Sequence, residues 1–194
     1  MPKLAALCVF CGSSMGLRSA YAEAATELGA LLAREGIQLV YGGGNVGLMG
    51  VVAKSCMESG GEVIGIIPRA LFKKEHGNQE ITRLEIVSSM HERKSRMSEL
   101  SDGFVALPGG IGTFEELLEV LTWSQLGIHR KPVAVINVGG YFNPLLALLD
   151  NALDEGFLGA EHRGLLLVSD RPGDLVSNLR KLDIHPAHNR SMGA

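Results

Sequence analysis

Short apolar runs alternate along the chain with longer segments in which apolar residues recur at helical spacing. The apolar runs are mostly continuous, which is typical of strands buried on both faces of a sheet. They predict six strands, at residues 4–10, 37–41, 62–67, 103–108, 132–138 and 165–169. The segments between them predict helices at about 19–35, 48–59, 90–101, 113–126, 143–155 and 172–181. This alternation predicts an α/β fold with a doubly wound parallel sheet, helices on both faces and right-handed crossovers.

A single domain is expected to span residues 1–194, because this length can bury most of its apolar surface in one core. Hydrophobic residues make up 46% of the chain and charged residues 20%, which indicates a globular protein. The longest irregular connection is predicted at 68–89, and long loops in compact domains are often functional. The tail, at about 183–194, has little apolar content and is expected to be flexible.

Charge and cysteine content exclude several classes of protein. The formal net charge is −3 and no Lys/Arg cluster lies beside aromatic residues, so no nucleic-acid partner is expected. The apolar runs are strand-sized and too short to span a membrane, so no membrane partner is expected. Three cysteines do not form a disulfide framework, and a cytoplasmic location is the simplest setting. Cys8 and Cys11 have C-x-x-C spacing, but they lie on a predicted strand, where core packing is expected rather than redox chemistry.

Glycine, serine and threonine gather where four of the predicted strands end. The segments are "CGSS" (11–14), "YGGGNVGLMG" (41–50), "IPRA" (67–70) and "PGGIGT" (108–113). Open α/β sheets bind ligands at the carboxyl ends of their strands, near a switch in strand order. These segments therefore predict one phosphate-sized concavity at that edge. The six histidines show no metal-ligand spacing, so neither a metal ion nor a cofactor is expected.

The segment "GGGNVG" (42–47) formally matches the dinucleotide fingerprint G-x-G-x-x-G. However, it follows the second predicted strand rather than the first, and the end of the next strand carries Pro68 and Arg69 instead of an acidic residue. Classical NAD binding is therefore not favoured. Two explanations remain: Gly43 and Gly44 let backbone amides approach a phosphate, or the glycines only permit tight packing.

The segment "PGGIGTFEE" (108–116) is a second glycine loop before a predicted helix, and it lacks the lysine of a nucleoside-triphosphate P-loop. Backbone amides at the helix start could receive a phosphate. Thr113 and Glu116 also match a capping box, in which Thr113 caps the helix and Glu116 reaches back to its backbone. Glu115 and Glu116 are about 100° apart on a helix, so the two carboxylates cannot have the same role.

Charged residues crowd the start of the helix predicted at 90–101, in "SSMHERKSRM" (88–97). One interpretation is a solvated helix face, with Met90, Met97 and Leu100 in the core. The other is that an arginine of this helix reaches a phosphate or a purine, because its planar guanidinium can bind oxygens or stack on a ring.

Taken together, "MHERK" (90–94) and "PGGIGTFEE" (108–116) resemble the LOG (Lonely Guy) family, whose pattern is P-G-G-x-G-T-x-x-E after a helix with M-H-x-R-K. The early "CGSS", "YGGGNVGLMG" and residues 117–137 are also similar, and the resemblance covers most of 5–180. It implies a Rossmann-like homodimer that hydrolyses the N-glycosidic bond of cytokinin riboside 5′-monophosphates, and of AMP, to free base and ribose 5-phosphate. Family members have also been labelled lysine decarboxylases, but no lysine here is placed as a pyridoxal-phosphate Schiff base.

By the same resemblance, Arg93 and Glu116 form the catalytic pair. The residues implied to contact the nucleotide, besides Arg93, are Glu75, Lys94, Gly109, Gly110, Ile111, Gly112, Thr113, Phe114, Glu115 and Thr122, with Gly43, Gly44 and Ser13 from the earlier loops. Glu116 would face the positive charge that develops at C1′ and orient the attacking water, while Glu115 would hold ribose hydroxyls. Arginine stays charged, so proton donation by Arg93 is not favoured.

A non-catalytic alternative has the same glycine-rich architecture. Molybdenum-cofactor carrier proteins resemble this chain and hold a phosphorylated ligand without hydrolysing it. The combination of Arg93 and Lys94 with Glu116 is the sequence feature that separates the two, and it favours the enzyme.

Overall fold

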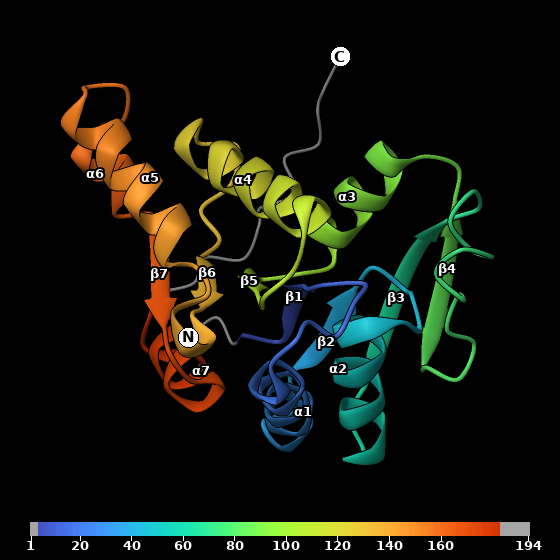
Figure 1. Ribbon diagram of the computed structural model, residues 1–194. Helices are drawn as coiled ribbons and strands as arrows, with labels where there is room; N and C mark the ends of the chain where they lie inside the picture. The colour runs from blue at the N-terminus through green and yellow to red at the C-terminus, as the bar shows by residue number, and fades with distance from the viewer. Residues whose placement is uncertain (1–3, 183–194) are drawn as a thin grey trace.

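The computed structural model describes residues 4–182, which form one seven-stranded, all-parallel sheet (Figure 1). The strand order is β4-β3-β2-β1-β5-β6-β7. The strands are β1 (Ala6–Phe10), β2 (Gln38–Tyr41), β3 (Val63–Pro68), β4 (Arg83–Val87), β5 (Gly103–Ala106), β6 (Val133–Ile136) and β7 (Leu166–Ser169). Strand order reverses between β1 and β5, so the crevice beyond their carboxyl ends is where such a sheet binds a ligand.

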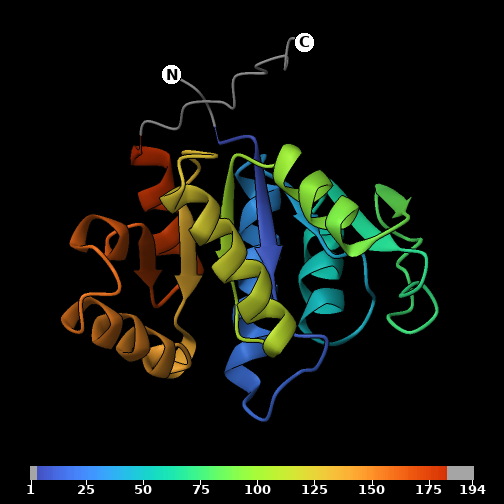
Figure 2. The same cartoon turned by 90° about the horizontal axis from the view of Figure 1, so that it is seen from above.

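Helices cover both faces of the sheet, as the two views of the ribbon show (Figures 1 and 2). One face carries α1 (Ser19–Arg34), α2 (Gly47–Glu58) and α7 (Pro172–Lys181). The other carries α3 (Met90–Glu99), α4 (Ile111–Gln125) and α5 (Asn143–Asp154), with the short helix α6 (Ala160–Arg163). The short helix η1 (Val138–Gly140) follows β6, and its Val138 packs in the core on the α1 side. The doubly wound α/β fold predicted from the sequence is confirmed.

Successive residues of the central strand β1 enter opposite cores, as the pleat of a strand requires. Leu7 and Val9 pack in the core under α1 and α2, while Cys8 and Phe10 pack in the core under α3, α4 and α5. All five residues of β1 are buried, which explains its continuous apolar run. Cys8 and Cys11 are free, buried and in opposite cores, so their predicted packing role is confirmed.

The expectation of a wholly irregular connection at 68–89 is wrong, because β4 lies within it and forms one edge of the sheet. Its sequence, R-L-E-I-V, places Arg83 and Glu85 among apolar residues, and most of the strand is partly or fully exposed. An edge strand of this kind lacks the apolar run of the central strands. The predicted flexible tail, 183–194, lies outside the described residues. Within residues 4–182, no helix is both long and apolar enough to cross a membrane.

Candidate active site

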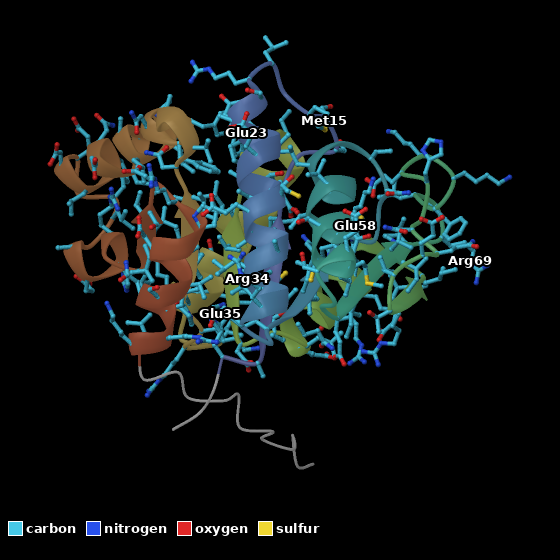
Figure 3. All side chains as sticks on the ribbon, turned by 90° about the horizontal axis from the view of Figure 1, so that it is seen from below. Met15, Glu23, Arg34, Glu35, Glu58 and Arg69 are labelled. Atoms are coloured by element: carbon cyan, nitrogen blue, oxygen red, sulfur yellow. The ribbon has the colours of Figure 1, made fainter. Side chains whose placement is uncertain are left out.

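A pocket of about 220 Å³ lies at the carboxyl ends of β1 and β5, where the strand order reverses. Its lining comes from the loops after these two strands, together with one residue each from α1, α2 and the loop before α5. The lining residues are Gly12, Ser13, Ser14, Met15, Gly16, Tyr21, Leu48, Pro108, Gly109, Gly110 and Tyr141. Figure 3 places Met15 at the end of the molecule where α1 begins, opposite to Glu35 at the far end of that helix. A concavity is therefore present at this edge, but of the four predicted segments residues 67–70 do not line it, and residues 41–50 contribute only Leu48.

Backbone hydrogen bonds hold the glycine-rich loops together at this edge. The Gly12 amide donates to the Pro108 carbonyl at 3.1 Å, and the Leu48 amide donates to the Gly12 carbonyl at 3.0 Å. Gly47 has a φ of 54°, and a Cβ there would lie 2.3 Å from the Ser14 nitrogen. Only glycine fits such a left-handed backbone so close to another loop. Close packing thus accounts for Gly47 of the "GGGNVG" segment.

Helix α4 begins at this pocket, and it begins earlier than the sequence predicted. Its N-cap is Gly110, no side chain caps it, and its first intrahelical bond runs from the Phe114 amide to the Gly110 carbonyl at 3.1 Å. The amides of residues 111–113 therefore have no partner within the helix, which is the usual form of an anion site. The capping-box interpretation of Thr113 and Glu116 is wrong, because Glu116 lies six residues beyond the N-cap.

A side-chain cap does occur at the start of α3. The Ser89 hydroxyl accepts from the Glu92 amide at 3.1 Å, and Glu92 Oε2 accepts from the Ser88 amide at 2.7 Å. This arrangement is close to a capping box. It fixes the first turn of α3, from which Arg93 and Lys94 point in directions about 100° apart.

Arg93 points toward the sheet and is buried, with 5% of its surface exposed. Its Nε donates to the Ile66 carbonyl at 3.1 Å and its Nη2 donates to the Gly42 carbonyl at 2.9 Å. A Cβ at Gly42 would lie 2.0 Å from Nη2, so Gly42 makes room for the guanidinium. Glu75 Oε2 lies 3.7 Å from the same nitrogen and makes no hydrogen bond within the described residues. Arg93 thus connects α3 to the ends of β2 and β3.

Lys94 points toward α4 instead. Its Nζ lies 2.5 Å from Glu115 Oε1 and 2.9 Å from Glu119 Oε1. Burial lowers the pKa of Lys94, but the hydrogen bonds and charges of the two carboxylates outweigh burial and raise that pKa overall. The lysine therefore stays charged and joins α3 to α4 beside the pocket.

Glu116 lies between these groups and is partly buried. Burial raises its pKa to about 7, with further increases from the charges of Glu115 and Glu75 and opposing decreases from Arg93 and Lys94. A carboxyl with a pKa near 7 can accept or release a proton at neutral pH, as general catalysis requires. Glu116 is thus the side chain of this cluster that is best suited to proton transfer.

Known proteins are similar to this chain over most of its length. The family model described as "Possible lysine decarboxylase" matches residues 49–179. LOGL2 of Oryza sativa subsp. japonica, a probable cytokinin riboside 5′-monophosphate phosphoribohydrolase, is 47% identical over 184 residues, which are 95% of this chain and 75% of the relative. LOG3 of Arabidopsis thaliana, a cytokinin riboside 5′-monophosphate phosphoribohydrolase, is 47% identical over 97% of this chain and 86% of its own. The chain belongs to the LOG family.

The molybdenum cofactor binding protein of Rippkaea orientalis is a structural neighbour with a TM-score of 0.68. The match covers 92% of this chain and 96% of that one, at 23% identity. At such low identity the likeness shows a common fold only.

In this member of the LOG family, some of the predicted site residues line the pocket, some are buried beside it and some are exposed. Ser13, Gly109 and Gly110 line the pocket, and Thr113 is buried beside Gly109. Phe114 packs against the rings of Tyr141 and Phe142 and belongs to the core under α4.

Two other predicted contacts are exposed on α4. Ile111 is exposed at the first position of the helix. Thr122 is exposed farther along, where its hydroxyl donates to the Leu118 carbonyl. Thr122 lies about 9 Å along the helix axis from Glu116, by the rise of an α-helix.

Four residues that line the pocket lie outside the segments predicted from the sequence: Met15, Gly16, Tyr21 and Tyr141. A signal for Tyr141 was available, since "GGYFN" (139–143) follows another predicted parallel strand and so had to lie at the same edge of the sheet. The described residues hold no group of three or more His, Cys, Asp or Glu side chains that could bind a metal ion.

Proposed function

We propose that this protein hydrolyses the N-glycosidic bond of a cytokinin riboside 5′-monophosphate, giving the free base and ribose 5-phosphate. LOG family membership supports the reaction, and the relatives are named for it. The structural observation that carries it is Glu116, whose pKa of about 7 places a titrating carboxyl just inside the helix that starts at the glycine pocket. The proposed phosphate site and the proton-transfer group therefore lie on one helix, α4. The reaction needs both, because its substrate carries a phosphate and its attacking water loses a proton.

The 5′-phosphate binds where α4 begins. Backbone amides at residues 111–113 and the positive end of the helix dipole attract an anion there. Gly109 and Gly110 add backbone without side chains, so the phosphate can approach closely. The pocket lining contains no carboxylate that would repel it.

The ribose then extends toward the carboxylates of α4. Bond cleavage makes an oxocarbenium-like sugar with positive charge at C1′, and an ionised Glu116 stabilises that charge. Glu116 also accepts a proton from the attacking water, whose oxygen forms the new bond to C1′. The electrons of the broken C–N bond leave with the base, which takes a proton from solvent. Glu115 holds ribose hydroxyls.

Arg93 assists chiefly through Glu116. Nε and Nη2 donate to backbone carbonyls, and in the part of the chain that the structure describes Nη1 donates only to the Met90 sulfur at 3.8 Å. Sulfur is a weak acceptor, so Nη1 is the nitrogen most available to substrate. Its positive charge lowers the pKa of Glu116 and so favours the ionised form that the water-activating step uses. Lys94, Glu75 and Thr122 contribute to substrate binding, as the family resemblance implies.

We also propose AMP as a second substrate, a homodimer as the working assembly and the cytoplasm as its location. Exposed apolar side chains on α3 and α4, at Met90, Ile111, Leu118 and Leu126, offer a contact for a second copy. Three buried free thiols suit a reducing compartment. Light scattering at the dimer mass across micromolar concentrations is the expected result, and a monomer mass throughout would contradict the assembly.

Purified protein incubated with a panel of 5′-monophosphates tests the function directly. Chromatography should detect free base and ribose 5-phosphate from a cytokinin riboside 5′-monophosphate, and from AMP if it is a substrate. The matching nucleosides should react far more slowly, because each lost charge-assisted hydrogen bond costs about 1.5–3 kcal/mol. Binding of the nucleotides without release of any base would refute the enzyme and favour a carrier.

A further inference from the structure

Tyr141 lines the glycine pocket from the loop after β6, the strand next to β5 in the sheet. It follows η1, after the end of β6, and its hydroxyl donates a hydrogen bond to the Gly109 carbonyl. Tyr141 and Gly109 both line the pocket in which the phosphate is proposed to bind. The bond therefore connects two segments that are 32 residues apart, directly at the proposed anion site.

The tyrosine is held in place by its own loop. The Asn137 side-chain amide donates to Asn143 Oδ1 at 2.8 Å, and Asn137 Oδ1 accepts from the Phe142 amide at 2.7 Å. Gly139 and Gly140, with φ of 57° and 76°, allow the chain to turn tightly between Asn137 and Asn143. These contacts fix the backbone on both sides of Tyr141, so its hydroxyl is presented at one place.

The ring of Tyr141 is held as well. Its centroid lies 6.4 Å from that of Phe114 in a stacked arrangement, and 5.1 Å from that of Phe142 edge to face. Tyr21 packs against it edge to face at 5.6 Å. Such aromatic pairs keep the ring in one orientation. Loss of the hydroxyl alone would leave this packing intact.

The peptide that Tyr141 contacts lies between two glycines, Gly109 and Gly110. In a trans peptide the carbonyl and the next amide point in opposite directions and turn as one rigid unit. With glycine on both sides, few steric restraints oppose rotation of that unit. Rotation would move the Gly109 carbonyl oxygen, which carries negative partial charge, relative to the phosphate, and would redirect the Gly110 amide at the N-cap of α4.

We propose that Tyr141 is a positioning residue of the phosphate site: its hydroxyl holds the Gly109 carbonyl and thereby fixes the amides at the start of α4 for the substrate's 5′-phosphate. This inference rests on the proposed function, because it assumes that the phosphate binds at α4. Tyr141 acts through the glycine loop, so its effect belongs to recognition of the phosphate and not to cleavage of the C–N bond.

The test compares Tyr141→Phe with Tyr41→Phe, which removes a tyrosine hydroxyl away from the pocket. Tyr41 is buried in the core under α1 and α2, does not line the pocket, and its hydroxyl makes no hydrogen bond within residues 4–182. Each protein is assayed on a cytokinin riboside 5′-monophosphate and on the same riboside without phosphate, and its binding of ribose 5-phosphate is measured by calorimetry. The ratio of kcat/KM for nucleotide over nucleoside does not depend on the fraction of protein that is folded.

For Tyr141→Phe, KM for the nucleotide and Kd for ribose 5-phosphate should rise roughly 2- to 12-fold, the effect of one hydrogen bond. Its kcat should stay within about twofold, and its kcat/KM for the nucleoside should not change. Tyr41→Phe should match the wild type in every measurement. These results together would separate a role in phosphate recognition from a role in packing alone.

Two results would overturn the inference. An unchanged nucleotide/nucleoside ratio in Tyr141→Phe, with a wild type that strongly prefers the nucleotide, would refute the role of Tyr141 and leave the proposed function standing. A wild type that hydrolyses the nucleoside as well as the nucleotide would show that no phosphate binds at α4. That outcome would remove both the phosphate assignment and the role of Tyr141.

Discussion

The two halves of the candidate site are built from different chemistry. The glycine half comprises the loops after β1 and β5 and the first residues of α4, and it presents backbone amides, small side chains and tyrosines. The carboxylate half comprises residues of α3 and α4 with Glu75 from the connection between β3 and β4, and it presents charged side chains, most of them paired. The glycine half is suited to an anion, and the carboxylate half is suited to a sugar that becomes positive.

The charge balance shows why the halves must be separate. The carboxylate half has four acids, Glu75, Glu115, Glu116 and Glu119, against two cations, Arg93 and Lys94. A phosphate placed among four carboxylates would be repelled, whereas a developing oxocarbenium would be stabilised. The excess of acids also keeps the pKa of Glu116 high. One helix, α4, contributes residues to both halves.

The largest effect is expected from Glu116→Gln, which removes the titrating group and keeps its size. Without a carboxylate to stabilise C1′ and accept the proton of water, kcat should fall by roughly 10²–10⁴. Nucleotide binding should persist, because the glycine half is unchanged. Base release and calorimetric binding, measured on the same preparation, would test both expectations.

Glu119→Gln is the matched control for that variant, since Glu119 lies one turn further along α4. Its carboxylate is paired with Lys94 at 2.9 Å, so it is not suited to proton transfer. We expect kcat within about fivefold of the wild type, as for the loss of one partly exposed ion pair. Equal losses in both variants would mean that charge anywhere in the carboxylate half matters and that Glu116 has no special role.

The glycine half should respond differently to Gly109→Ala. A Cβ there would lie 2.1 Å from Thr113 Oγ1 and 2.9 Å from the Gly12 nitrogen, so the loop must shift. KM for the nucleotide should rise roughly 10-fold or more, because displaced amides lose charge-assisted hydrogen bonds to phosphate. The value of kcat at saturation should change less. Steady-state kinetics on the nucleotide measure this split.

Gly110→Ala sharpens the same comparison, because no atom of residues 4–182, apart from those of its chain neighbours, lies within 4 Å of a Cβ at Gly110. A rise in KM for this variant would therefore report a clash with the bound substrate and not a distorted loop. If Gly109→Ala lowered kcat and left KM unchanged, the assignment of phosphate binding to the glycine half would be wrong.

The architecture could be predicted because buried parallel strands leave a strong signal. The continuous apolar runs of β1 and β5 identified the strands whose carboxyl ends form the pocket, and "PGGIGT" marked the loop. The edge strand β4 was missed because its solvent-exposed positions interrupt the apolar run. Tyr141 was missed for another reason: its loop has two glycines but no serine or threonine, unlike the segments "CGSS" and "PGGIGT".

The start of α4 shows a different limit of sequence reasoning. Thr113 and Glu116 have the spacing of a capping box, but the helix starts at Ile111, so the same spacing falls inside it. Glycines leave the first helical residue undefined, since they fit both loop and helix ends. The role of Glu116 depends on what surrounds it in space, namely Arg93, Glu115 and Glu75, and only the fold brings these residues together.

The smallest effect expected is on stability, and its sign depends on pH. Burial raises the pKa of Glu116 to about 7 in the folded protein, above the value near 4.5 of an unperturbed glutamate. Between these two values the folded state holds a proton that the unfolded state releases, so Glu116 loses stabilising effect as pH rises through 7. Glutamine is neutral at every pH and carries no such cost.

Glu116→Gln should therefore be more stable than the wild type by about 1–3 kcal/mol at pH 8, and the difference should become small near pH 5. Other titrating groups are the same in both proteins and largely cancel in the comparison. Urea unfolding of both proteins at the two pH values measures the difference. Removal of Glu119 should not reproduce it, since Glu119 has Lys94 as its counter-ion at 2.9 Å. The variant could instead be less stable than the wild type at pH 8, or exceed it in stability by the same amount at pH 5 and pH 8. Either result would show that the buried charge of Glu116 does not destabilise the folded protein. The carboxylate half would then lack the energetic cost that distinguishes it from the glycine half.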